Sequence, residues 1–164
     1  MPIKDFELFH GVVLTRLVRS DKPLTLRMIE THDDSWGVYK INDEVELFIK
    51  HSASPRKLSR GKGGWSWVFH FSLEHIRLLK EIQTSRPVYI ALVCGRRDIK
   101  RGRMEICFLE PDDFSQVIDL DTLEAQSVTI RLSTGARNFR AFLDRKEIPL
   151  SSLNAIDRWV VPGN

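Results

Sequence analysis

A chain of 164 residues has the usual length of one domain, and at this size folding buries well over half of the surface that the unfolded chain exposes. Its two cysteines, Cys94 and Cys107, lie in separate apolar runs, which is typical of buried thiols in a reducing compartment and argues against a disulfide scaffold or a cysteine zinc motif. The net charge of +3 is only mildly basic, and no apolar run approaches the roughly 18 residues of a membrane span. We therefore expect a single domain over residues 1–164, cytoplasmic and without a membrane partner.

Basic residues are gathered in three stretches of the chain. Segment 50–62 holds five Lys and Arg residues and no acid, segment 96–103 holds five against one acid, and the tail after residue 127 adds a third group. If these stretches converge on one face, that face can dock on phosphate; the alternative is ordinary solvated loops. The residues that we predict to contact nucleic acid are Arg56, Lys57, Arg60, Lys62, Arg96, Arg97 and Arg101.

The first third of the chain predicts one helix followed by three strands. Apolar residues at spacings of three and four predict an amphipathic helix over 4–19. Alternation at period two predicts a strand over 24–30. Residues 36–41 and 44–50 flank Asn42 and Asp43, both turn formers, and so predict an antiparallel hairpin.

The middle of the chain predicts a loop, a strand, a helix and a buried strand. Residues 51–64, rich in Gly, Ser and basic residues, predict a loop, and alternation predicts a strand over 65–71. Ser72 is a good N-cap for a helix that runs to about Ile82. The continuous apolar run 87–94 is typical of a central strand buried on both faces, which we expect helices to cover.

The remainder is predicted to be mainly β. Strands are expected over 104–109, 128–132 and 139–143, with a short helix over 111–118 and a C-terminal segment anchored by Trp159. Trp65 and Trp67, which follow the basic loop, either stack on bases or form a core-facing strand with Phe69 and Phe71, and alternation favours the core. The fold class is therefore mixed α/β.

The predicted order of elements over about 4–95, without the strand at 65–71, is αβββαβ, and it resembles the core of the PD-(D/E)XK (restriction-endonuclease-like) superfamily. This resemblance implies a mixed central sheet, with extra strands in a β-rich extension over 98–164. Phe9-His10-Gly11, 47–52 and 92–95 also resemble a group of small bacterial proteins, which implies no function.

The PD-(D/E)XK resemblance implies a Mg²⁺ site in which two carboxylates bind the metal and a lysine on the third strand polarises the attacking water. Lys50 matches the position of that lysine, but Phe48 stands where the family has an acid. The candidates to supply the missing acid are Glu46, on the same strand face as Lys50, and Glu74, on the second helix. The remaining metal ligand would be Glu30, Asp33 or Asp34.

Three functions follow as hypotheses. The first is a nucleic-acid-binding domain that acts as a Mg²⁺-dependent nuclease through Lys50. The second is a non-catalytic binding module that keeps the fold, and Phe48 favours it. The third is a protein-interaction domain that uses a sheet edge or the tail after residue 127. Each acidic candidate also has an ordinary explanation as a helix-start, turn or ion-pair residue.

Overall fold

The computed structural model describes residues 1–19, 22–32, 36–96, 104–150, 156, 159 and 161, with the side chains of 30–32 left out. Its helices are α1 (Asp5–Val18), α2 (Leu73–Gln83) and α3 (Pro111–Val117). Its strands are β1 (Leu26–His32), β2 (Trp36–Ile41), β3 (Val45–Ser52), β4 (Arg56–Lys57), β5 (Gly64–Phe71), β6 (Val88–Cys94), β7 (Glu105–Leu109), β8 (Gln126–Ser133), β9 (Arg140–Leu143) and β10 (Lys146–Ile148). The predicted mixed α/β class is confirmed.

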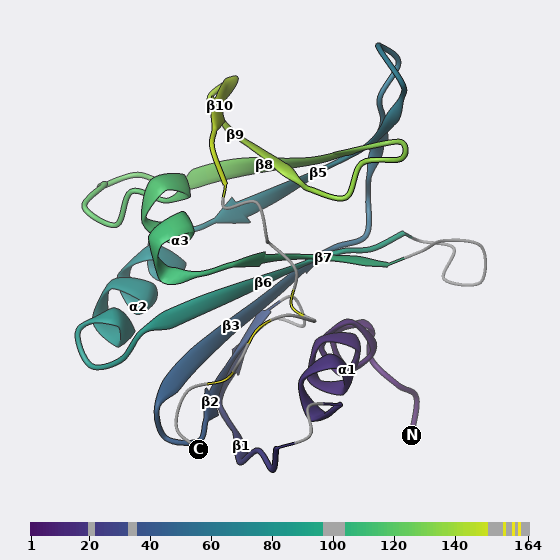
Figure 1. Ribbon diagram of the computed structural model, residues 1–164. Helices are drawn as coiled ribbons and strands as arrows, with labels where there is room; N and C mark the ends of the chain where they lie inside the picture. The colour runs from purple at the N-terminus through teal and green to yellow at the C-terminus, as the bar shows by residue number, and fades with distance from the viewer. Residues whose placement is uncertain are drawn as a thin grey trace.

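The strands form two five-stranded sheets (Figure 1). Sheet A has the order β1-β2-β3-β6-β7, and sheet B has the order β10-β9-β8-β5-β4. In sheet A only β3 and β6 run parallel, and the connection between them passes through β5 and α2. Sheet A is therefore mixed, while sheet B is antiparallel throughout.

The strands β2, β3 and β6 of sheet A are buried on both faces, as their apolar runs require, whereas the edge strand β1 is largely exposed. One face packs against Phe9, Val13 and Leu17 of α1. The anchoring role predicted for Trp159 is also confirmed, because its ring packs on Tyr89 and Phe108 of this face, at centroid distances of 4.5 and 4.8 Å. The other face of sheet A packs mainly on sheet B, and not on helices alone as expected from the sequence.

The strand predicted at 65–71 forms β5, and it begins the second sheet. Trp67, Phe69 and Phe71 of β5 point toward sheet A and are almost fully buried, which confirms the core-facing prediction for this strand. The indole N–H of Trp67 donates a 2.8 Å hydrogen bond to the carbonyl oxygen of Gly95, at the end of β6, and so joins the two sheets. Residues 66, 68 and 70 consequently face outward from sheet B.

Helices α2 and α3 lie at one end of the molecule, between the diverging sheets (Figure 1). The hydroxyl of Ser72 accepts a hydrogen bond from the backbone N–H of His75, which confirms the predicted N-cap of α2. Cys94 and Cys107 are free and fully buried, as predicted. Within the described residues, no helix is long and apolar enough to cross a membrane.

Two strands were not predicted. The loop expected over 51–64 contains β4, and the segment after β9 forms β10. Both strands are only two or three residues long, too short for a period of alternation to be recognised. The turn between β9 and β10 holds Asp144 and Arg145 at positive φ, as Asn42 and Asp43 are held between β2 and β3.

Candidate nucleic-acid interface

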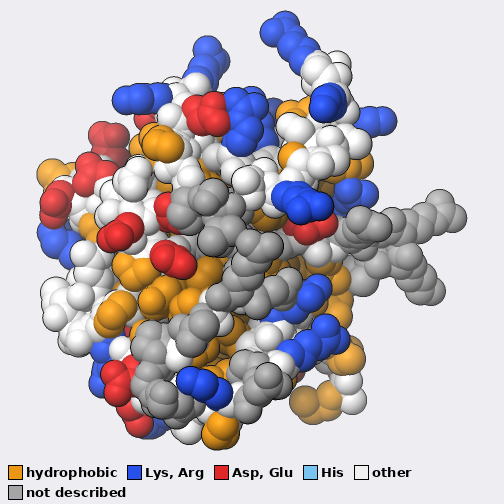
Figure 2. All heavy atoms as spheres, in the orientation of Figure 1, with side chains coloured by type: hydrophobic (Ala, Val, Ile, Leu, Met, Phe, Trp, Pro, Cys, Tyr) orange, Lys and Arg blue, Asp and Glu red, His pale blue; other side chains and the backbone are white. Residues whose placement is uncertain are grey.

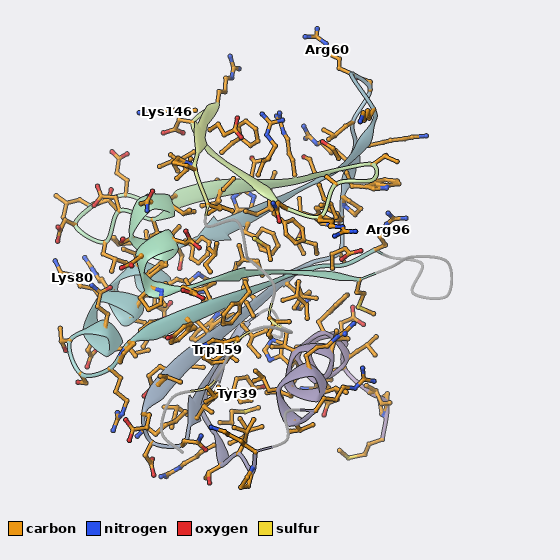
Figure 3. All side chains as sticks on the ribbon, viewed as in Figure 1. Tyr39, Arg60, Lys80, Arg96, Lys146 and Trp159 are labelled. Carbon is orange, nitrogen blue, oxygen red and sulfur yellow. The ribbon has the colours of Figure 1, made fainter. Side chains whose placement is uncertain are left out.

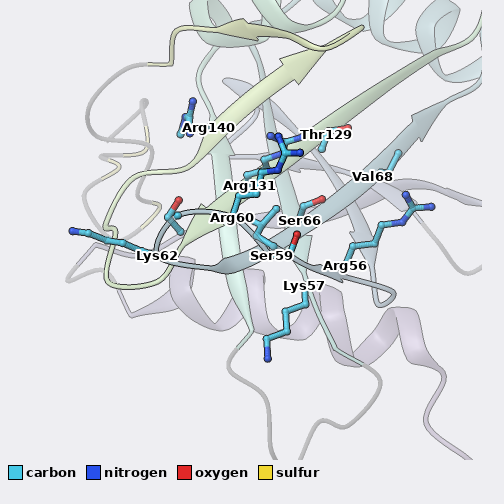
Figure 4. Close-up of a pocket in the computed structure, with 13 residues that line it drawn as sticks. Arg56, Lys57, Ser59, Arg60, Lys62, Ser66, Val68, Thr129, Arg131 and Arg140 are labelled. Carbon is cyan, nitrogen blue, oxygen red and sulfur yellow. The ribbon is translucent and has the colours of Figure 1, made fainter.

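A basic groove crosses the outer face of sheet B, with a volume of about 730 Å³ (Figure 4). Its floor is formed by outward-facing residues of β5, β8 and β9, and residues 56–62, from β4 and the turn after it, border it. Six of the described residues that line it are cationic and none is acidic. These six are Arg56, Lys57, Arg60, Lys62, Arg131 and Arg140.

The border of the groove depends on glycines in the turn between β4 and β5 and at the first residue of β5. Gly61, Gly63 and Gly64 all have positive φ, a conformation that L side chains rarely adopt. A Cβ atom on Gly64 would also overlap the carbonyl oxygen of Leu132 on the neighbouring strand. The glycine-rich loop read from the sequence is therefore a tight turn that carries Arg60 and Lys62 above the sheet.

Strand register places four of the groove residues in one line across sheet B. Arg56 of β4 pairs with Ser66 of β5, Ser66 pairs with Arg131 of β8, and Arg131 pairs with Arg140 of β9. We call these four residues the arginine row. Like charges directly opposite each other on neighbouring strands destabilise a sheet, so the Arg131–Arg140 pair is costly unless an anion lies between or beside them.

One carboxylate neutralises one end of the row. Glu147 of β10 accepts two hydrogen bonds from Arg140, of 2.7 Å from Nε and 2.6 Å from Nη2. These hydrogen bonds hold the pKa of Glu147 below its ordinary value. Arg131 has no such partner among the described residues: its guanidinium lies 4.3 Å from the ring centroid of Phe142, and its buried Nε has no hydrogen-bond acceptor.

The predicted nucleic-acid contacts divide into two groups. Arg56, Lys57, Arg60 and Lys62 line the groove. Arg96 lies apart from Arg60 (Figure 3), with its guanidinium carbon 4.2 Å from the ring centroid of Trp65, a residue of the inner face of β5. Arg97 and Arg101 fall outside the described residues.

The structure adds Arg131 and Arg140 to the predicted interface. The tail was recognised as basic, but only the pairing of β8 with β5 and β9 brings it beside segment 56–62. In Figure 2, Lys and Arg side chains gather along the top of the molecule, over sheet B, whereas several Asp and Glu side chains lie along one side. Two of the three basic stretches, residues 56–62 and the tail, therefore meet at the groove.

Lys50 lies between the sheets, not in the groove. Its side chain is 7% exposed, and its Nζ lies 6.0 Å from the ring centroid of Phe71 on the inner face of β5. Burial lowers the pKa of Lys50. In sheet A it is flanked by Trp36 of β2 and Leu92 of β6. Sheet B consequently separates this lysine from the arginine row.

The described acids do not converge on Lys50. Glu46 is four residues away on the same strand, roughly 13 Å at the usual rise, with Phe48 between them. Its carboxylate instead pairs with Arg86 at 3.4 Å, and burial raises its pKa against the opposing effects of Lys40 and Arg86. Glu74 is exposed in the first turn of α2.

Glu46 and Glu74, the two predicted acids whose side chains the structure describes, therefore do not form a Mg²⁺ site with Lys50. No group of three or more His, Cys, Asp or Glu side chains is placed to hold a metal ion in the part of the chain that the structure describes. Asp33, Asp34 and the side chain of Glu30 lie outside that part.

A second polar cluster is buried between α1 and sheet A. His10 is 1% exposed, and its Nδ1 lies 3.0 Å from the hydroxyl of Tyr39. The pKa of His10 is lowered to about 4, because burial disfavours the charged imidazolium and, to a smaller extent, because His51 repels it. The three described pockets are not lined by His10, Tyr39 or His51, and the contact between His10 and Tyr39 joins α1 to β2.

Comparison of the chain with protein families, with curated proteins and with solved structures gave no match. The function is therefore inferred from the groove.

Proposed function

We propose that the protein is a nucleic-acid-binding module that holds the phosphate backbone in the basic groove of sheet B. The observation that carries this proposal is the convergence of six cations, from three strands and one turn, around a single concavity with no acid in its described lining. Lys and Arg side chains supply most of the affinity of proteins for nucleic acid, because each phosphate contact releases condensed counterions.

Although the charge of Glu147 also acts on Arg131, five of these cations form no direct ion pair with a carboxylate among the described residues: Arg56, Lys57, Arg60, Lys62 and Arg131. Holding them together in the free protein is unfavourable, and a polyanion would relieve that repulsion. Since their contacts would be to phosphate and not to base edges, binding is expected to depend little on sequence.

Catalysis is the less favoured hypothesis. Lys50, the residue that the PD-(D/E)XK resemblance makes catalytic, is buried on the other side of sheet B from the groove. A strand held by the arginine row would therefore not reach Lys50. Phe48 in place of the family's acid, and the engagement of Glu46 with Arg86, also favour a module that binds without cleaving.

The test is fluorescence anisotropy of labelled oligonucleotides at several salt concentrations. If five cations each neutralise one phosphate, log K falls with log salt at a slope of about −3.5 for a single strand and −4.5 for a duplex. Affinity would then fall roughly 100- to 500-fold between about 50 and 200 mM salt. Polyglutamate serves as a competitor, because equal binding of a polypeptide would favour the protein-interaction hypothesis.

Cleavage is tested with the same oligonucleotides in the presence of Mg²⁺. The proposal predicts binding without cleavage, and Mg²⁺-dependent cleavage that Lys50→Ala abolishes would establish the nuclease hypothesis instead. Absence of salt-dependent binding to any nucleic acid would contradict the proposed function.

A further inference from the structure

The arginine row has a direction that limits which nucleic acid the groove can hold. Its members lie on four neighbouring strands, and each step across a sheet is about 4.8 Å, so the row is roughly 14 Å long and perpendicular to the strands. A row of this length spans only a few consecutive phosphates of one nucleic-acid strand.

The groove beside the row is small. Its volume of about 730 Å³ lies within the range of roughly 300–1,000 Å³ typical of pockets that enclose single small molecules. Residues 58–62 of the turn after β4 line the groove together with the sheet residues, so the cations surround a trough and do not cover a flat surface (Figure 4). A space of this volume can enclose a short stretch of one strand, but it is too small to enclose both backbones of a duplex.

The donors of the row suit the oxygens of a phosphate group. Arg131 is held by its contact with Phe142, which orients its guanidinium at a small cost in side-chain entropy. The side chains of Ser66 and Thr129, which line the groove beside it, supply hydroxyl donors. A guanidinium pair with neighbouring hydroxyls presents planar, bidentate donors to phosphate oxygens.

The ion pair between Glu147 and Arg140 shows how an anion can bind to the arginine row. Its carboxylate takes the Nε and Nη2 donors of Arg140, in the bidentate arrangement that phosphate oxygens also adopt. Both side chains are about half exposed, at 47% and 52%, so an incoming phosphate can exchange with the carboxylate. No described carboxylate occupies the corresponding donors of Arg131.

We propose that the ligand of the groove is single-stranded nucleic acid, whose backbone runs along the arginine row with one phosphate held beside Arg131. This inference rests on the proposed function and narrows it. Contacts are to the backbone, so either DNA or RNA of any sequence is accepted.

The first experiment measures binding of the full chain to a labelled oligothymidine series of about two to twelve nucleotides, and to a duplex of the longest length. We expect affinity to rise steeply over the first few nucleotides and then slowly, and the single strand to bind about tenfold tighter than the duplex. A duplex that binds equally well or better would overturn the single-strand inference and leave the proposed function intact. Absence of salt-dependent binding to both would overturn the proposed function itself.

The second experiment assigns the site. Arg131→Gln is expected to weaken single-strand binding about tenfold and to reduce the salt slope by about 0.7. Arg131→Lys should keep the slope but recover only part of the affinity, because it restores the charge without the fork. Arg77→Gln, an exposed arginine of α2 outside the groove, is the matched control and should bind as the parent does. Unchanged binding by folded Arg131→Gln, with the fold verified by circular dichroism, would exclude the row as the binding site.

Discussion

The buried pair of His10 and Tyr39 makes the fold sensitive to acid, in a way that a double substitution should remove. Because the pKa of His10 is about 4 when folded and about 6.5 when unfolded, the unfolded chain binds a proton between these values that the folded chain does not. Stability is thus fully present above about pH 6.5 and is lost as the pH falls toward about 4. At about 1.4 kcal/mol for each pH unit, His10 accounts for a loss of up to about 3 kcal/mol.

The double variant His10→Phe/Tyr39→Phe removes the titrating group together with its hydrogen-bond partner. At pH 7 its free energy of unfolding should stay close to that of the parent, because no buried hydroxyl loses its partner and the unpaired Nε2 of His10 disappears. Between about pH 7 and pH 4 the variant should lose about 3 kcal/mol less than the parent.

The assay is urea unfolding followed by tryptophan fluorescence at several pH values, with Tyr39→Phe as the control. Tyr39→Phe removes the hydrogen bond but keeps the buried imidazole, so its acid sensitivity should remain. Any acid sensitivity that the double variant retains is expected to come partly from His51, whose pKa is also lowered by burial. If the double variant and the parent lost the same stability on acidification, the assignment to His10 would be wrong.

Three further substitutions test other parts of the structure. Lys50→Met should raise the free energy of unfolding at pH 7 by about 1 kcal/mol or more in urea titrations, since it removes a buried ammonium. The parent is expected to gain stability as the pH rises toward about 10.4, the pKa of an unfolded lysine, and Lys50→Met should not show this gain. A variant less stable than the parent would indicate an anionic partner for Lys50. Trp67→Phe should destabilise the fold by about 2–3 kcal/mol in the same assay, because the Gly95 carbonyl loses its donor and a cavity forms; a change below about 0.5 kcal/mol would contradict the bridging role. Glu147→Gln should free Arg140 and steepen the salt dependence of oligonucleotide binding by about 0.7, measured by anisotropy, and weaker binding would refute its role as a competitor.

Local patterns in the sequence were sufficient to predict most of the elements. The spacing of apolar residues predicted α1, and the Ser72 cap predicted the start of α2. The turn formers Asn42 and Asp43 predicted the β2–β3 hairpin, and both adopt the positive φ that such turns use. These signals are contained within a few consecutive residues, so the sequence alone determines them.

The sequence did not reveal how the strands are distributed between sheets. Alternation predicted that Trp67, Phe69 and Phe71 face a core, but it could not show that this core lies against sheet A, because period two is the same for every half-buried strand. Lys50 matched the position of the family's lysine, but this match did not show where the Glu46 carboxylate would lie. In the structure that carboxylate pairs with Arg86, at the opposite end of β3 from Lys50.

The candidate site shows the same division between sequence and tertiary structure. The cations of 56–62 were evident from the sequence, because charge density along the chain is a local property. Arg131 and Arg140 join them only through the pairing of β8 with β5 and of β9 with β8, between residues far apart in the chain. The sequence by itself therefore determined that the protein carries basic segments with few acidic neighbours along the chain. Only the tertiary structure decided that residues 56–62 and the tail form one groove, because strand register sets which side chains become neighbours.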